Sequence, residues 1–193
     1  MYNKIAINMV IFIKWTKTEK MNTATLIVSA ILVKKTSNSC LIYTQTRWKP
    51  SVSPNYSGLI EIPAGVINAY ENIYEALGRE IKEECGMEIV KIVGDWKSEI
   101  EMPRNQDKTF AFRPFICQQA LQTNDGLPWI GFVFVCEVQG EPQLDPTEAK
   151  DPRWLSVTDL KELITVSPEK IFPVQLPVLK YFTESIENGQ LKI

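Results

Sequence analysis

The hydrophobic positions of this chain form short runs rich in β-branched residues, and polar turns separate these runs. Short apolar runs bounded by turn residues are typical of buried strands. The pattern predicts a first strand at Leu26–Val33 and a second at Cys40–Thr46, joined through the polar turn Thr36–Ser39. Further strands are predicted at Gly58–Ile62, Glu88–Met102, Thr109–Gln118 and Trp129–Val138, with a short extended segment at Arg153–Ser156.

Three other segments have helical periodicity: Asn72–Cys85, Val157–Ile164 and Val174–Ile186. The first of them stops at Gly86, a residue type favoured just beyond a helix C-terminus. Strands and helices follow one another without repeats or a linker, which predicts one mixed α/β domain with helices packed on a sheet. The intervening loops are predicted at Arg47–Ser57, Pro103–Lys108 and Gln139–Asp151.

The chain length of 193 residues fits one globular domain. Near the beginning, Ile5–Ile13 is an apolar-rich run that is far too short to span a bilayer. Large and charged residues follow it, where a signal peptide would have a small-residue cleavage site, and Met21 is an alternative start. We therefore expect residues 1–20 to form an extension or an additional edge strand, residues 21–193 to form the domain, and the protein to be cytoplasmic.

The composition excludes several kinds of catalytic site, metal site and partner. The net charge of −2 gives no basic surface for nucleic acid or an anionic membrane, so neither is expected as a partner. The chain has no His, which excludes Ser-His-Asp triads, Cys-His dyads and His-containing zinc sites. A protein that binds phosphates with so little positive charge would rely on metal ions. The cysteines form no C-x-x-C pair and are expected to be buried, reduced hydrophobes: Cys40, Cys85, Cys117 and Cys136.

Three carboxylates share one face of the first predicted helix. At about 100° per residue, Glu80, Glu83 and Glu84 lie within a sector of about 100°. Like charges at this spacing destabilise a helix by a few tenths of a kcal/mol per pair, and a divalent cation would offset the repulsion. A solvated acidic face is the alternative interpretation. The neighbouring face is apolar and would seat the helix on the sheet through Tyr74, Leu77, Ile81 and Cys85.

Gly78 stands inside this helix, where glycine costs about 1 kcal/mol relative to alanine. A close approach of helix and sheet would explain its presence.

The stretch from Gly65 to Met87 matches G-x5-E-x7-R-E-U-x-E-E-x-G-U at every fixed position, where U is an apolar residue. This pattern is long and specific, and through it the chain resembles the Nudix hydrolases. The resemblance implies an α/β/α sandwich with a mixed β-sheet and a catalytic loop–helix–loop. It also implies an enzyme in which water attacks one phosphorus of a nucleoside diphosphate derivative.

The resemblance carries roles onto individual residues. Glu80, Glu83 and Glu84 would bind Mg²⁺ or Mn²⁺, and Gly65 would offer its backbone carbonyl to a metal ion. Metal ions would lower the pKa of the attacking water and neutralise charge on the leaving phosphate. The remaining two fixed residues, Arg79 and Glu71, would form a buried pair that orients the metal-binding glutamates.

The substrate class is less well determined. The segment Glu61–Gly65, E-I-P-A-G, resembles the one that precedes the motif in ADP-ribose and nucleotide-sugar pyrophosphatases, the favoured group. Pro103 lies sixteen residues after Met87, near the place of a proline marker of the ADP-ribose group, although a simple turn proline is the alternative. The residues after it, Arg104-Asn105-Gln106, depart from the pattern of that marker.

Several candidates outside the motif stay open. Glu148 lies six residues before Trp154 and could be a further metal-binding or base carboxylate, or one acid in an acidic loop. An adenine ring could stack on Trp48, Trp129 or Phe112, although aromatic residues more often serve the core. The loops at 47–57 and 103–108 are expected to set substrate preference, and the basic residues near them are Arg47, Lys49, Arg104 and Arg113.

Two alternative functions remain: a nucleoside triphosphate pyrophosphohydrolase and a non-catalytic nucleotide-sensing module. The intact glutamates speak against a sensor, which need not keep them. The partner is expected to be a small nucleotide. A homodimer is also an option, with the N-terminal run as an exchanged strand.

Overall fold

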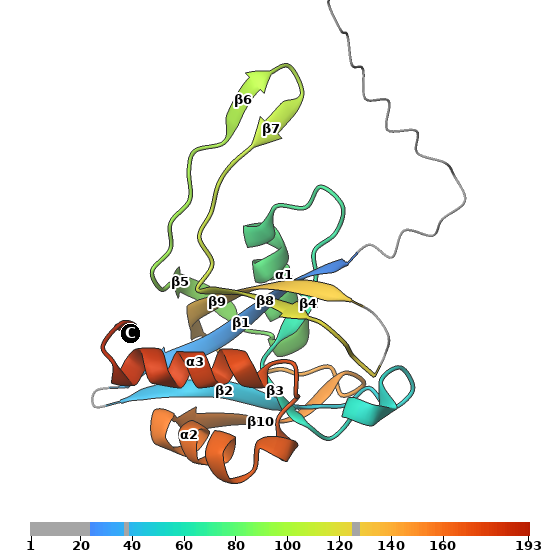
Figure 1. Cartoon of the computed structure of the whole chain (residues 1–193), viewed down its shortest axis with the longest axis vertical. Coiled ribbons are helices and arrows are strands. Elements are labelled where there is room, and N and C mark those ends of the chain that lie inside the picture. Colours follow the sequence, from blue (N-terminus) through green and yellow to red (C-terminus); the bar gives the residue numbers. More distant parts are fainter. Residues whose placement is uncertain (1–23, 37–38, 125–127) are drawn as a thin grey trace, which may run out of the picture.

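A computed structural model describes residues 24–36, 39–124 and 128–193. Its centre is a mixed sheet in the order β10-β2-β1-β9-β5, with β3 beside β2, β4 beside β1, and β8 beside β9 (Figure 1). The long strands β1 and β9 pair in parallel, whereas the other described pairs of this sheet are antiparallel. The bounds are β1 Thr25–Lys35, β2 Cys40–Arg47, β3 Ile60–Glu61, β4 Ala64–Val66, β5 Glu88–Ile92, β8 Ile116–Ala120, β9 Trp129–Gln139 and β10 Ala149–Ser156.

Helices cover both faces of this sheet. The helix α1 (Ile73–Cys85) packs on one face, and α2 (Val157–Val166) and α3 (Leu176–Glu187) pack on the other (Figure 1). Successive side chains of β1 alternate between them: Leu32 belongs to the core beneath α1, and Ile31 to the core beneath α2 and α3. The predicted α/β/α sandwich with a mixed sheet is therefore confirmed.

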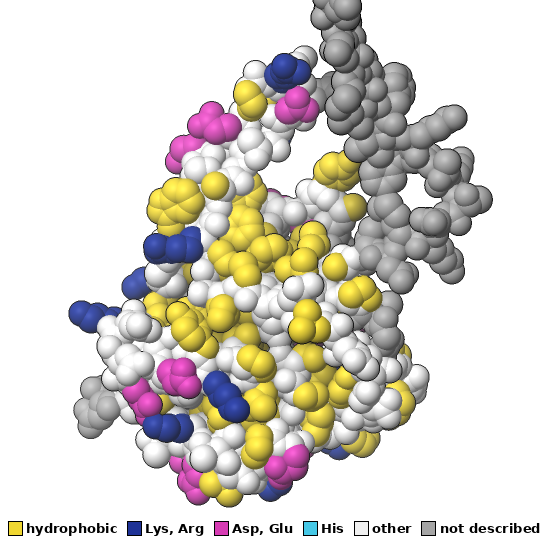
Figure 2. All heavy atoms as spheres, in the orientation of Figure 1, with side chains coloured by type: hydrophobic (Ala, Val, Ile, Leu, Met, Phe, Trp, Pro, Cys, Tyr) yellow, Lys and Arg dark blue, Asp and Glu magenta, His cyan; other side chains and the backbone are white. Residues whose placement is uncertain are grey.

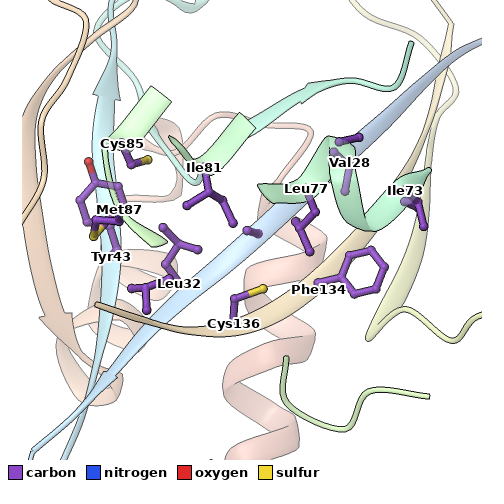
Figure 3. Packing of buried hydrophobic residues seen from close by; sticks show 13 residues of the cluster. Val28, Leu32, Tyr43, Ile73, Leu77, Ile81, Cys85, Met87, Phe134 and Cys136 are labelled. Atoms are coloured by element: carbon purple, nitrogen blue, oxygen red, sulfur yellow. The ribbon is translucent and has the colours of Figure 1, made fainter. Parts of the chain in front are cut away.

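The apolar stripe of α1 seats the helix as the sequence pattern predicts. Leu77, Ile81 and Cys85 are fully buried and point toward the sheet (Figure 3). Phe134 and Cys136 of β9 lie opposite them in the same cluster. Tyr74, the fourth stripe residue, is only partly buried. Its ring packs against those of Phe110, Phe112 and Phe134. Complete burial of such side chains contributes about 1.5–3 kcal/mol each.

The predicted strands Glu88–Met102 and Thr109–Gln118 are wrong over part of their length. The strand β5 ends at Ile92, and β8 begins only at Ile116. Between them, β6 (Glu101–Arg104) and β7 (Asp107–Thr109) form a separate hairpin that projects from the body (Figure 1). Exposed apolar residues in the hairpin region, Ile100 and Met102, made the strand pattern look continuous.

Several boundaries also differ. The strand β10 starts at Ala149, so the loop predicted at Gln139–Asp151 is shorter. The three-residue strand β4, which contains a glycine, had no run long enough to be recognised. The predicted loop Arg47–Ser57 contains the short 3-10 helix η1 (Pro54–Tyr56), and a second one, η2 (Pro168–Lys170), lies between the last two helices. The apolar run at residues 5–13 lies outside the described residues. No described helix is long and apolar enough to span a bilayer.

The explanation offered for Gly78 is also wrong. A Cβ atom at this position would meet no described atom within 4 Å, so the helix does not need glycine there to approach the sheet.

On the face shown in Figure 2, hydrophobic side chains gather between the base of the hairpin and α3. Described Lys and Arg side chains on this face are dispersed among Asp and Glu. This distribution agrees with the small net charge and gives no continuous basic surface on the side in view.

Candidate active site

The loop between β4 and α1 brings the glycine end of the motif against the acidic face of the helix. Strand β4 pairs antiparallel with β1, which holds Gly65 opposite Val28. The side chain of Asn72 accepts a hydrogen bond from the Tyr74 backbone N–H and so caps the N-terminus of α1. At the other end, Gly86 takes a left-handed conformation with φ 68° and closes the helix. The cap at Gly86 was expected from the sequence pattern, whereas Asn72 was predicted as the first helical residue and is the N-cap.

This face forms one wall of a pocket of about 520 Å³. The volume lies within the range of about 300–1,000 Å³ that is usual for small-molecule sites. Four of the predicted site residues in the Nudix motif line it, together with Glu148 from the loop before β10. The pocket lining includes Arg47, Lys49, Tyr56, Glu61, Gly65, Glu80, Glu83, Glu84, Trp129, Asp145, Glu148, Phe172 and Gln175.

Glu84 is the buried carboxylate of the pocket, with 8% of its surface exposed. One oxygen accepts a hydrogen bond from the Ala64 backbone N–H at 3.1 Å. Burial, reinforced by the negative charge of Glu61, raises the pKa of Glu84 to about 8, against the opposing effect of Lys49. Burial also raises the pKa of Glu61, although Arg47 at 3.1 Å opposes this shift. Two buried carboxylates thus stand close together with incomplete compensation of charge.

Glu80 lies directly over Gly65. A Cβ atom at position 65 would fall 1.8 Å from the Glu80 carboxyl carbon, so any other residue would displace this carboxylate from its place. The close approach places the Glu80 oxygens beside the backbone of β4.

Arg79 ties the remaining acids of the motif together. Its Nε and Nη2 donate to the two oxygens of Glu71 at 2.8 and 2.9 Å, and Nη2 also donates to the Val66 carbonyl. Its Nη1 donates to Glu80 at 2.6 Å and to Glu83 at 3.1 Å. The hydrogen bonds from Arg79 lower the pKa of Glu71 to about 2. The pair with Glu71 exists, but it is half-buried rather than buried, since 29% of the Arg79 side chain is exposed.

Glu148 reaches the pocket from the loop before β10. Its Oε2 atom lies 2.9 Å from the Nζ atom of Lys49, and its backbone carbonyl accepts from the Trp48 N–H. The same Lys49 atom lies 3.9 Å from Glu84. The structure therefore brings Glu148 close to the carboxylates of α1, although 64 positions separate it from Glu84 in the sequence.

The pocket lining also contains aromatic rings. The rings of Tyr56 and Phe172 meet edge to face with centroids 5.0 Å apart, and the Arg47 guanidinium lies 5.2 Å from the Phe172 ring centroid. The side-chain amide of Gln175 accepts a hydrogen bond from the Ile62 N–H and donates one to the Ile62 carbonyl, at 2.8 Å each. Sequence reasoning missed Tyr56, Phe172 and Gln175, because nothing in their local pattern distinguishes a pocket residue from a core residue.

Some of the residues considered for base stacking or phosphate contact line the pocket, and others lie elsewhere. Trp129 lines the pocket, whereas Trp48 carries Lys150 over its ring and Phe112 packs in the core beneath α1. Among the basic candidates, Arg47 and Lys49 line the pocket. Arg104 belongs to the projecting hairpin and, like Pro103 and Arg113, is not among the residues that line this pocket, so the role expected of residues 103–108 stays a prediction.

The donor set fits a hard divalent cation. Glu80, Glu83 and Glu84 and the Gly65 carbonyl offer oxygen ligands, the donor type that such a cation prefers. Within the described residues, no three acidic or cysteine side chains already converge in metal-binding geometry. The reason is visible at Arg79, which draws Glu80 and Glu83 toward itself. Ligation therefore requires side-chain rotation of these two glutamates.

A sandwich with a pocket of clustered carboxylates beside a half-buried arginine defines the class of metal-assisted phosphohydrolases. A family model described as NUDIX domain matches residues 24–175, most of the chain. The chain belongs to the NUDIX family and is an enzyme of it, a Nudix hydrolase. Hydrolases of this family use divalent metal ions and act on nucleoside diphosphate derivatives. A comparison with curated proteins found no match.

Solved structures of low identity share the fold. A MutT protein from Methanosarcina mazei has 18% identity and a TM-score of 0.58, over 84% of this chain and 94% of its own. The NUDIX domain of Shewanella oneidensis NrtR, solved with ADP ribose, has 13% identity and a TM-score of 0.57, over 85% and 89%. A candidate asymmetric diadenosine tetraphosphate hydrolase from Jonesia denitrificans has 14% identity and a TM-score of 0.59, over 89% and 98%.

Proposed function

We propose that this enzyme hydrolyses the diphosphate bridge of ADP-ribose or a nucleotide sugar with Mg²⁺ or Mn²⁺. The observation that carries the proposal is the pocket of about 520 Å³, whose lining combines carboxylates with aromatic rings. Carboxylates with bound cations suit a diphosphate, and rings beside them suit a flat base. One pocket thus provides for both parts of a nucleoside diphosphate derivative.

The residues of α1 would hold the cation. Glu80, Glu83 and Glu84 would provide carboxylate oxygens, and Gly65 would provide its backbone carbonyl. When bound, Mg²⁺ or Mn²⁺ supplies a Lewis acid that lowers the pKa of the attacking water and neutralises charge on the phosphates. Arg79 holds Glu80 and Glu83 beside the pocket through the hydrogen bonds of its Nη1 atom until they rotate to bind the cation, and Glu71 in turn fixes Arg79.

Glu148 would act as the general base that accepts the proton of the attacking water. Its carboxylate is partly exposed at the pocket, where a water molecule can reach it, and Lys49 holds it toward the α1 carboxylates. Water then adds to one phosphorus atom while the P–O bond of the diphosphate bridge breaks. With ADP-ribose the products are AMP and a ribose phosphate, so atoms and charge balance without a further reactant.

The preference for a diphosphate rests on charge and on the E-I-P-A-G segment. Only Arg47 and Lys49 are basic among the described residues of the pocket, and Arg47 is already paired with Glu61. A third phosphate would need further positive charge. Glu61, Ala64 and Gly65 of this segment line the pocket, and its backbone N–H groups at Ile62 and Ala64 donate to the side chains of Gln175 and Glu84. The family resemblance of this segment points to the same substrate class.

The test is a comparison of kcat/KM for ADP-ribose, a UDP-sugar, diadenosine tetraphosphate and the nucleoside triphosphates, each with Mg²⁺ and with products separated by chromatography. We expect ADP-ribose or the nucleotide sugar to have the highest value, because kcat/KM measures discrimination between transition states. EDTA should abolish the reaction, and Mg²⁺ or Mn²⁺ should restore it.

Release of pyrophosphate from a triphosphate at higher kcat/KM would overturn the substrate assignment in favour of a triphosphate pyrophosphohydrolase. Nucleotide binding without turnover of any substrate would favour a sensing module. Full activity in EDTA would remove the cation from the proposal.

A further inference from the structure

Lys49 stands among the carboxylates of the pocket, and its position is fixed by the surrounding loop. Its backbone N–H donates to the Ser57 hydroxyl at 3.0 Å, and its carbonyl accepts from the Ser53 N–H at 2.8 Å. The side chain is 22% exposed. A surface lysine would sample many rotamers, whereas this one extends from an anchored backbone into a pocket.

The charges around Lys49 are mostly negative. Its ammonium lies 2.9 Å from Glu148 and 3.9 Å from Glu84, while Glu61 and Asp145 line the same pocket. The other cations nearby are already engaged: Arg47 pairs with Glu61, and Arg79 pairs with the outer acids of α1. Lys49 is thus the described side-chain cation that contacts the buried Glu84.

We propose that Lys49 is a positioning residue that holds the site in its metal-free state and links cation binding to diphosphate binding. The inference rests on the proposed function, since it takes Glu84 as a ligand of the divalent cation. An ammonium and a divalent cation cannot both approach the same carboxylate without mutual repulsion, which is strong at a partly buried site. Arrival of the cation therefore displaces Lys49 from Glu84.

A diphosphate gives the displaced ammonium a new partner. Lysine is a compact point charge on a flexible stem, suited to move a short distance from a carboxylate to a phosphate oxygen. In the free enzyme Lys49 opposes the cation, and in the ternary complex it is neutralised by the substrate. Bound diphosphate should consequently strengthen cation binding, and by linkage the cation should strengthen diphosphate binding to the same degree.

The test measures Mn²⁺ binding to the full chain by electron paramagnetic resonance of the free ion. It compares the wild type with Lys49→Met and Lys49→Arg. Without nucleotide, we expect Lys49→Met to bind Mn²⁺ about tenfold more tightly, and Lys49→Arg, which keeps the charge, to remain near the wild type. Lys150→Met removes a nearby positive charge outside the pocket and should leave the affinity unchanged. Lys49→Gln serves as a second variant if Lys49→Met does not fold.

The same titration with α,β-methylene-ADP, a diphosphate that resists cleavage at its bridge, tests the linkage. The nucleotide should tighten Mn²⁺ binding in the wild type and tighten it by a smaller factor in Lys49→Met. Unchanged or weaker Mn²⁺ binding by folded Lys49→Met without nucleotide would overturn the inference, even if the wild type hydrolyses ADP-ribose. Failure of the wild type to hydrolyse any diphosphate would overturn the proposed function alone, because the Mn²⁺ affinities do not depend on turnover.

Discussion

The two faces of the central sheet are built from similar layers but differ in what they bury. Beneath α2 and α3, apolar side chains such as Leu160, Leu179 and Phe182 fill the core. The buried hydroxyls on α3, those of Thr183 and Ser185, donate to carbonyls of their own helix. Beneath α1 the core is also apolar, yet the edge of this helix buries the carboxylate of Glu84.

The difference shows how one fold separates stability from chemistry. A buried hydroxyl that bonds its own helix is satisfied without any outside group. A buried carboxylate near a second carboxylate is costly unless something positive joins it. On the face with α2 and α3 the buried groups therefore serve stability, whereas on the face with α1 the buried carboxylates depend on the neighbouring cations Arg47 and Lys49.

The largest expected effect is on the chemistry of the α1 face. Glu80→Gln keeps the size of the side chain beside Gly65 but removes its charge, and we expect kcat/KM to fall about 10³-fold, equivalent to about 4 kcal/mol. Removal of a group that only orients a metal ligand typically lowers metal affinity or activity about 10–100-fold, so removal of a direct ligand should lower activity further. Glu75→Gln, on the exposed side of the same helix, is the matched control. Equal activity in both variants would contradict the assignment of Glu80.

On the sheet face beneath α2 and α3, we expect a core mutation to lower the free energy of unfolding. Phe182→Ala removes a fully buried ring and leaves a cavity beneath α3, so the free energy of unfolding should fall by about 3–4 kcal/mol. Urea unfolding measures this loss. Tyr181→Ala, the neighbouring and partly exposed position, should cost less. The folded fraction of Phe182→Ala should keep its KM, and a raised KM at low temperature would show that the two faces are not independent.

Glu84 makes metal-free stability depend on pH. Its pKa is about 8 in the folded protein and 4.5 as a free side chain, so the folded state binds more protons between these values. Stability should therefore fall as pH rises from about 5 to about 8. Glu84→Gln should remove roughly 2–3 kcal/mol of this fall in the free energy of unfolding. Denaturant unfolding in EDTA at both pH values tests this, and parallel pH profiles for the two proteins would contradict it.

The smallest expected effect compares two glycines of the motif. Gly78→Ala should stabilise α1 by up to about 1 kcal/mol, because its Cβ has free space among the described atoms and alanine favours a helix. Gly65→Ala should instead displace Glu80 and lower activity. Thermal unfolding and kcat/KM of both variants provide the measurement. A destabilised Gly78→Ala would mean that a contact beyond the described residues occupies that space.

The sequence by itself determined the elements that obey a strict local period. The helix α1, with Asn72 and Gly86 at its ends, follows from apolar spacing and from the preferences of capping residues. The long strands β1 and β9 follow from β-branched runs. The motif also named the acids of α1, because their spacing along one helix places them on one face whatever surrounds the helix.

Only the tertiary structure decided which distant residues complete the pocket. Lys49, Glu148 and Phe172 come from three separate segments, and they meet because β2 and β10 pair and because Phe172 donates its backbone N–H to Ile60. The burial of Glu84 likewise depends on its neighbours rather than on its place in the helix. The hairpin at β6 and β7 was misread for the converse reason, since an alternating pattern does not reveal whether a strand joins the sheet or leaves it. Local period fixes the conformation of a segment, but contacts across the sheet decide its environment.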